Sequence, residues 1–155
     1  MSESRGAPRV VLDTNVCLDL FVFDDPRVAL LREALGAGAV VAVADAHTRR
    51  EWARVLGYPA LRLDAAMQAA ALAAFDGAVQ VIGDADASAP PQPGPAVPLP
   101  RCRDPDDQVF LALARASGAR WLFSRDLALL ELSRRRQRSD GCEVVTPEAW
   151  APASA

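Results

Sequence analysis

Residues 9–13 read Arg9-Val10-Val11-Leu12-Asp13, and this stretch decides the fold class of the chain. Its three consecutive aliphatic residues predict a short strand that is buried on both faces and ends at an acid. Residues 40–44 form a second run of this kind, which ends at Asp45. Continuously apolar strands, rather than strands that alternate with polar residues, are typical of a parallel sheet covered on both sides.

The rest of the chain alternates such strands with helical patterns. Further strands are predicted over 79–82, 121–124 and 143–146, and helices over 16–23, 26–35, 49–56, 62–75, 104–116 and 127–135. This alternation predicts an α/β fold, a three-layer sandwich with a central, mainly parallel five-stranded sheet. A length of 155 residues fits one domain over 1–155, with a core at about 9–150.

Residues 84–100 interrupt this alternation, since they are rich in proline, alanine and aspartate. We expect them to form an extended surface loop. A loop of this length inside a compact domain points to a functional segment.

The bulk composition excludes several classes of protein. Hydrophobic residues make up 51% of the chain, which predicts an ordinary folded protein. No apolar run is long enough to cross a bilayer, and the first residues lack the apolar segment of a secretory signal, so we expect a cytoplasmic protein without a membrane partner. Cys17, Cys102 and Cys142 are widely spaced and odd in number, which indicates reduced thiols.

The charge balance argues against nucleic-acid binding by bulk charge, because the net charge is −3 and the pI is about 5.1. The basic residues are all arginine, and four of them, Arg134, Arg135, Arg136 and Arg138, form a dense run. This run is either a solvated helix end or a patch that contacts phosphate, and the sequence leaves both open.

Acidic residues gather where the predicted strands end. Asp13 closes the first strand, Asp45 closes the second, Glu51 lies in the helix after it, and Asp126 follows the fourth strand by two residues. In open α/β sheets, the site lies beyond the carboxyl ends of the strands. We therefore expect these acids at one end of the sheet.

Asp107 lies at a position where an unpaired carboxylate would destabilise the fold. On a helical wheel it shares a face with Phe110, Leu111 and Ala114, which should pack on the sheet. A carboxylate on such a face needs a partner, a hydrogen bond or a metal ion. Asp104 lies one turn earlier, near the same face.

Each acid also has a simpler structural interpretation. Asp13 could cap the following helix, Glu51 could close a capping box with Thr48, Asp104 could be an N-cap before Pro105, and Asp126 could begin a turn. Their convergence at one end of one sheet favours a site for Mg²⁺ or Mn²⁺ instead, since hard cations prefer oxygen ligands. Such a cation activates water against a phosphoryl group.

Other kinds of catalytic site are not supported. His47 is the single histidine, so a two-histidine metal site is excluded, and it has no G-x-S-x-G partner for a serine hydrolase. The chain has neither a Walker A loop nor a G-x-G-x-x-G loop, which leaves nucleotide-cofactor binding without support.

Four segments resemble the motifs of PIN domains, in order and over nearly the whole chain. They are Val11-Leu12-Asp13-Thr14-Asn15, the segment 50–56 around Glu51, the segment 103–114 around Asp107, and Trp121-Leu122-Phe123-Ser124-Arg125-Asp126. The Asp-Pro-x-Asp form at 104–107 and the long loop before it are most similar to the toxins of toxin–antitoxin pairs, the VapC-like ribonucleases.

This resemblance implies a metal-dependent endoribonuclease that leaves a 5′-phosphate and a 3′-hydroxyl. Asp13, Glu51, Asp107 and Asp126 would bind Mg²⁺ or Mn²⁺. Asn15, Ser124 and Asp104 would support them. Because the loop over 84–100 leads directly into Arg101 and Arg103, we expect these two arginines to contact the RNA substrate, together with Arg125. The resemblance also implies a small antitoxin protein as a partner, and a homodimer.

Two rival functions remain to be weighed. The first is a catalytically silent RNA- or protein-binding module on the same fold, and the presence of all four acids argues against it. The second is a phosphatase of the haloacid dehalogenase type, which needs a second aspartate two residues after the first and a lysine. The chain has Asn15 at that position and contains no lysine.

Overall fold

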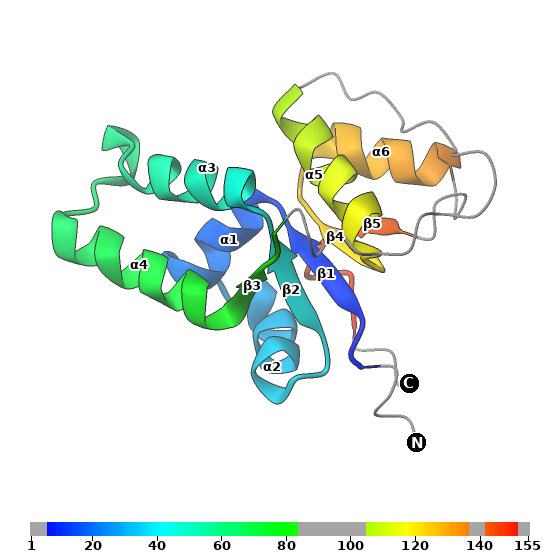
Figure 1. Ribbon diagram of the computed structural model, residues 1–155, viewed down its shortest axis with the longest axis horizontal. Coiled ribbons are helices and arrows are strands. Elements are labelled where there is room, and N and C mark those ends of the chain that lie inside the picture. The colour runs from blue at the N-terminus through cyan, green and yellow to red at the C-terminus, as the bar shows by residue number, and fades with distance from the viewer. Residues whose placement is uncertain (1–5, 84–104, 137–141, 152–155) are drawn as a thin grey trace.

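The structure is a computed structural model that describes residues 6–83, 105–136 and 142–151 (Figure 1). For residues 105–108 and 132–136 it describes the course of the backbone only. The predicted loop over 84–100 and the predicted site residues Arg101, Arg103 and Asp104 therefore lie outside the described residues.

The described elements follow the predicted order. The strands are β1 (Arg9–Leu12), β2 (Val41–Ala44), β3 (Val79–Val81), β4 (Trp121–Phe123) and β5 (Glu143–Val145). The helices are α1 (Thr14–Phe21), α2 (Ala29–Ala37), α3 (Ala46–Leu56), α4 (Ala65–Ala78), α5 (Pro105–Ser117) and α6 (Leu127–Arg136), with short 3₁₀ turns η2 (Pro26–Val28) and η3 (Pro59–Leu61). Within the described ranges, no helix is both long and apolar enough to cross a membrane.

The strands form one five-stranded sheet with the order β3-β2-β1-β4-β5, and all its pairings are parallel. The chain moves outward from β1 through β2 to β3, and then returns to the other side of β1 for β4 and β5. The order in which the chain adds strands to the sheet therefore reverses between β1 and β4, although the two strands run parallel. In open α/β sheets, the crevice beyond the carboxyl ends of such a pair is where ligands bind.

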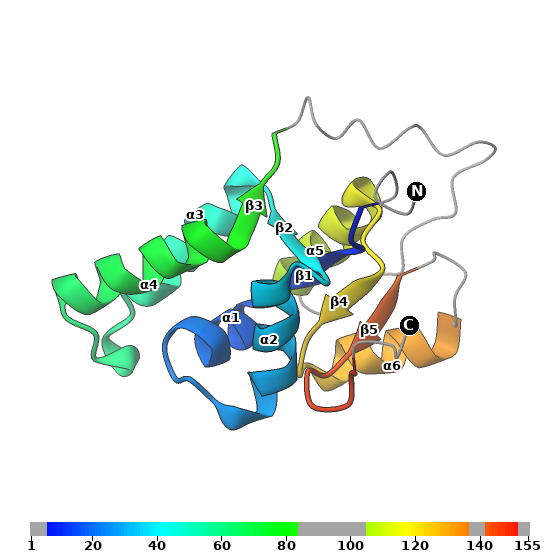
Figure 2. The same ribbon diagram turned by 90° about the horizontal axis from the view of Figure 1, so that it is seen from below.

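Helices cover both faces of this sheet, with α1 to α4 on one face and α5 and α6 on the other (Figures 1 and 2). Val10 and Leu12 of β1 enter the core beneath α1 to α4, whereas Val11 enters the core beneath α5 and α6. Successive side chains of a strand point to opposite faces, so a central strand needs an unbroken apolar run. The predicted three-layer α/β fold is confirmed.

Aromatic packing fixes the orientation of α3, the helix that carries Glu51. The indole of Trp52 stacks on Phe75 of α4 with ring centroids 5.8 Å apart, and Phe21 of α1 meets Trp52 edge-on at 6.0 Å. Because Trp52 is buried, Glu51 beside it is held at the rim of the core, partly exposed.

Aspartate caps set helix starts that the apolar periodicity misplaced. Asp45 accepts a hydrogen bond from the backbone of Thr48, so α3 begins three residues earlier than predicted. Asp64 caps α4 in the same way, and that helix begins three residues later than predicted. The helix predicted over 26–35 is divided into η2 and α2, because Val28 leaves the helical conformation with φ −102° and ψ 12°.

Candidate active site

The fold brings three of the predicted acids into one cleft of about 390 Å³. Asp13 reaches it from the end of β1, Glu51 from α3 and Asp126 from the segment after β4. This is the crevice beside the reversal point of the sheet, where the sequence predicted the site.

Asp13 is buried, with 5% of its surface exposed, and its two carboxylate oxygens have different donors. The backbone N–H of Thr14 donates to Oδ1 at 2.6 Å, and the hydroxyl of Ser124 donates to Oδ2 at 2.6 Å. The backbone N–H of Asp13 donates to the carbonyl of Phe123 at 2.9 Å. Asp13 is thus the N-cap of α1 and, at the same time, the link between β1 and β4. Capping leaves lone pairs for a cation, because an ionised carboxylate accepts about four bonds.

Ser124 is fully buried and organises the segment that leads to Asp126. Its hydroxyl oxygen accepts a hydrogen bond from the backbone N–H of Asp126 at 3.0 Å while it donates to Asp13. Asp126 in turn accepts from the backbone N–H of Ala128 through Oδ1, at 2.8 Å, and so caps the start of α6. One hydroxyl therefore sets the spacing between two candidate ligands.

Glu51 takes no part in capping, so the simpler interpretation of this residue is wrong. The capping box of α3 is formed by Asp45 and Thr48, which exchange hydrogen bonds of 2.8 Å and 3.0 Å. Glu51 lies one turn further along the helix. Its Oε2 accepts from the guanidinium of Arg54 at 2.6 Å, a pair in which Arg54 is 63% exposed.

Asn15, predicted to support Asp13, lines the cleft, and its amide oxygen is buried. No hydrogen-bond partner for this Oδ1 is found in the part of the chain that the structure describes. Buried polar atoms are normally satisfied, by protein groups or by ordered water. The Oδ1 of Asn15 departs from this rule.

Asp107 lies in the first turn of α5, but its side chain is outside the described part of the structure. Val109 and Phe110 of the same helix line the cleft. The predicted core-facing stripe is present, since Phe110, Leu111 and Ala114 are all buried. The start of α5 therefore borders the cleft, and the placement of the Asp107 carboxylate stays a prediction.

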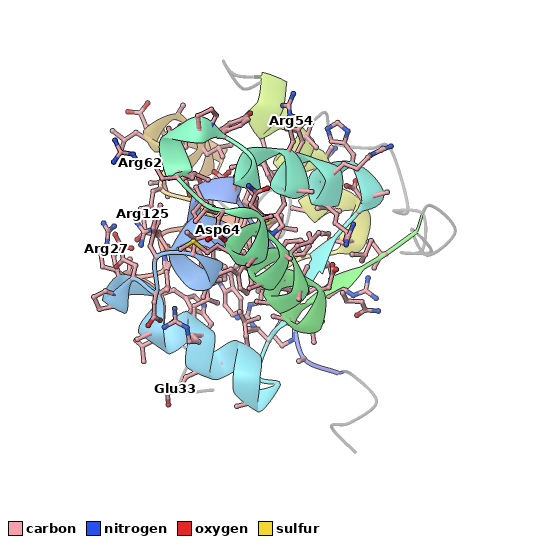
Figure 3. The ribbon with its side chains drawn as sticks, turned by 90° about the vertical axis from the view of Figure 1, so that its left-hand side faces the viewer. Arg27, Glu33, Arg54, Arg62, Asp64 and Arg125 are labelled. Atoms are coloured by element: carbon pink, nitrogen blue, oxygen red, sulfur yellow. The ribbon has the colours of Figure 1, made fainter. Side chains whose placement is uncertain are left out.

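Arg125, predicted to contact substrate, does not line the cleft. Its guanidinium forms ion pairs with Asp19 of α1 and with Glu148, and its side chain is 17% exposed. Figure 3 shows Arg125 well apart from Arg54.

Sequence reasoning singled out Glu51 but overlooked that the α3 face around it lines the cleft. His47, Glu51, Arg54 and Val55 lie on it, and Tyr58 follows at the end of the helix. These positions recur at intervals of three and four residues, which is the spacing of one helical face. The same helical wheel that singled out Asp107 would have found them.

The negative charge of Asp13 reaches into the core. The pKa of the buried Cys17 thiol is raised, first by burial and second by the carboxylate of Asp13.

All the polar groups named at the cleft wall, apart from His47 and Arg54, offer oxygen. Among the side chains that the structure describes, however, no three acids, histidines or cysteines lie close enough together to form a metal site.

Comparison with known proteins places the chain in a family. A family model described as PIN domain matches residues 9–128, a range that includes Asp13, Glu51, Asp107 and Asp126. No curated protein matches the chain. A chain in the crystal structure of VapBC2 from Rickettsia felis, bound to a DNA fragment from their promoter, is similar with a TM-score of 0.55 and 14% identity, over 89% of this chain and 98% of that one. That likeness shows a shared fold, and the family model shows more: the chain belongs to the PIN-domain family.

Proposed function

We propose that this protein is a metal-dependent endoribonuclease and the toxin of a toxin–antitoxin pair. In this proposal, Asp13, Glu51, Asp107 and Asp126 hold Mg²⁺ or Mn²⁺ at the site of RNA cleavage. The observation that carries it is the convergence of Asp13, Glu51 and Asp126, from three separate parts of the chain, on one cleft. Membership of the PIN-domain family supports a nuclease. The likeness in fold to VapBC2 supports the toxin assignment.

The oxygen-bearing side chains at the cleft wall support the proposed divalent cation. The acids of the cleft and the amide oxygen of Asn15 are the ligand types that Mg²⁺ prefers. Mg²⁺ also keeps several of its waters, so carboxylates that do not touch one another suit a hydrated ion.

A bound cation would activate water and stabilise the charge that develops on a phosphoryl oxygen. The residues of the chain supply orientation. The N–H of Thr14 and the hydroxyl of Ser124 hold the carboxylate of Asp13 in one position. Arg54, which lines the cleft and pairs with Glu51, would contact a substrate phosphate in this proposal.

A cleavage assay on total RNA tests the proposal. With Mg²⁺ or Mn²⁺ the protein should cut RNA and leave 5′-phosphate and 3′-hydroxyl ends, and EDTA should abolish the cutting. Asp13→Asn should be inactive. Asp64→Asn is the matched control, because it makes the same change at a helix cap outside the cleft and asparagine also caps helices. Equal activity of all three proteins would contradict the proposed site.

The alternative is a silent module that binds RNA or protein on the same fold. It predicts RNA binding without cleavage, and binding that Asp13→Asn leaves unchanged. End-group analysis of the RNA after incubation separates the two functions, because only a nuclease creates new 5′-phosphates.

The toxin assignment has its own test. Expression of the wild-type chain in bacteria should arrest growth, Asp13→Asn should not, and the product of a short neighbouring reading frame should relieve the arrest. Sedimentation of the purified chain would show whether it forms the homodimer that the family resemblance implies. If bacteria that express the wild-type chain keep growing although the purified chain cleaves RNA in vitro, the protein is a nuclease but not a toxin.

A further inference from the structure

We propose that Arg125 is a positioning residue, and that its ion pairs with Asp19 and Glu148 hold the Ser124–Asp126 segment in the geometry of the metal site. The pairing of these three residues is independent of the function, whereas the consequence for catalysis rests on the proposed nuclease. This role replaces the contact with RNA that the sequence suggested for Arg125.

The guanidinium of Arg125 joins three parts of the fold. Asp19 lies on α1, the helix that Asp13 caps, and it is buried with 8% of its surface exposed. Glu148 follows β5 and accepts a hydrogen bond from Arg125 at 3.0 Å. Arg125 itself belongs to the link between β4 and α6. The link is therefore tied on one side to the helix of Asp13 and on the other to the segment after the edge strand.

Hydrogen bonds also hold the link between β4 and α6 in the described part of the chain. The backbone N–H of Ser124 donates to the carbonyl of Val145 at 3.1 Å, and that of Leu130 donates to the carbonyl of Asp126 at 3.0 Å. The bonds of the Ser124 hydroxyl described above join them. The two neighbours of Arg125 in sequence are Ser124, which bonds to Asp13, and Asp126, which lines the cleft, while its own side chain pairs with Asp19 and Glu148. Arg125 anchors the link at its centre.

Two observations argue against a substrate contact for Arg125. Its charge is already shared between two carboxylates, and its side chain is only 17% exposed. Arg54, by comparison, lines the cleft and is 63% exposed. A guanidinium is suited to bridging two acids because its donors form a rigid planar fork, which lysine does not have.

The variants Arg125→Met, Arg125→Lys and Asp19→Asn test this role. Arg49→Met is the matched control: Arg49 forms a partly exposed ion pair with Asp76, away from the cleft and from Glu148. Mutation of a residue that orients metal ligands typically lowers metal affinity or activity about 10-fold or more. Arg125→Met and Asp19→Asn should both weaken Mn²⁺ binding and lower kcat by about tenfold. In both variants, KM for RNA should stay within about twofold of the wild-type value, and the core should remain folded.

Arg125→Lys should resemble Arg125→Met, because lysine keeps the charge but cannot bridge both acids. Arg49→Met should bind Mn²⁺ and cleave RNA as wild type does. A rise in KM with unchanged kcat in Arg125→Met, restored in Arg125→Lys and absent in Asp19→Asn, would instead make Arg125 a substrate contact and overturn the proposal.

Amide hydrogen exchange gives a measurement that needs neither metal nor RNA. The N–H groups of Asp126 and Ala128 donate to Ser124 and Asp126, and they should lose protection in Asp19→Asn while the amides of β1 keep it. If Asp19→Asn does not fold, Glu148→Gln at the exposed end of the same guanidinium serves in its place. Unchanged protection of these two amides would refute the positioning role. A wild-type protein that binds no Mn²⁺ and cuts no RNA would refute the nuclease, while the exchange data still decide the role of Arg125.

Discussion

The hydroxyl of Ser124 donates a 2.6 Å hydrogen bond to Oδ2 of Asp13, between residues 111 positions apart in the chain. Both side chains are buried, and the bond joins the ends of β1 and β4, the two strands between which the order of strands along the chain reverses. Ser124 is thus the partner through which the fourth motif orients the first acid.

Replacement of Ser124 by alanine should therefore affect stability and catalysis together. Asp13 would lose a donor to a buried carboxylate, which costs about 1–3 kcal/mol of unfolding free energy. Ser117→Ala is the matched control, since Ser117 is also buried and its hydroxyl donates within its own helix, to the carbonyl of Ala114 at 3.3 Å. Urea unfolding should show a larger loss for Ser124→Ala. Equal losses in the two variants would argue that the bond to Asp13 contributes little.

Glu51→Gln should separate function from stability. The ion pair of Glu51 with Arg54 is on the surface, and such pairs contribute about 0–1 kcal/mol. RNA cleavage should nevertheless be lost, because a proposed ligand is neutralised. Asp76→Asn is the control: it breaks the exposed pair with Arg49, 2.7 Å long, away from the cleft. Both variants should melt within a few degrees of wild type, and only Glu51→Gln should be inactive. Activity in Glu51→Gln would remove this residue from the site.

The buried Cys17 thiol should make the protein less stable at alkaline pH. Its pKa in the fold is raised above the ordinary value of 9.0, by burial and by Asp13. Above that value the unfolded chain releases the proton and the folded chain retains it, so stability is full below pH 9.0 and declines as the pH rises further. The slope for one group is about 1.4 kcal/mol per pH unit.

Unfolding of wild type and Cys17→Ala between neutral and alkaline pH measures this effect. The variant should show a shallower decline, although it is less stable overall because a buried side chain is shortened. Identical slopes would mean that Cys17 titrates alike in both states.

Asp107→Asn tests the acid whose side chain the structure leaves undescribed. Carboxylates held close together repel one another without metal, so removal of one charge should leave the apo protein as stable as wild type or more so. Mg²⁺ at ten times its Kd should stabilise wild type by about 1.4 kcal/mol, and the variant by less. Thermal melts in EDTA and in Mg²⁺ measure both effects. A destabilised variant with an undiminished Mg²⁺ response would show Asp107 to be a structural residue.

Much of the architecture could be predicted from local sequence. The apolar run of β1 is buried on both faces and predicts a central parallel strand wherever it lies in a sheet. The stripe of Phe110, Leu111 and Ala114 likewise predicted the buried face of α5. These predictions succeeded because burial depends on the period of the apolar residues, which is a local property.

Helix caps were harder to assign, because several polar residues in a row can each serve. Thr48 pairs with Asp45 rather than with Glu51, and this choice decides that Glu51 is available to the cleft. Sequence spacing allowed both pairings. The path of the chain out of β2, with Asp45 in an extended conformation, allows only one.

The sequence by itself determined the strands, the helices and the acids that end them. The tertiary structure alone decided that β4 lies beside β1, that Ser124 meets Asp13, and that Arg125 turns to Asp19. The physical reason is that an apolar strand can pair with any similar strand, so its sequence does not specify which strand lies beside it. A contact between residues 111 positions apart depends on the order of the strands, which the packing of the whole chain sets.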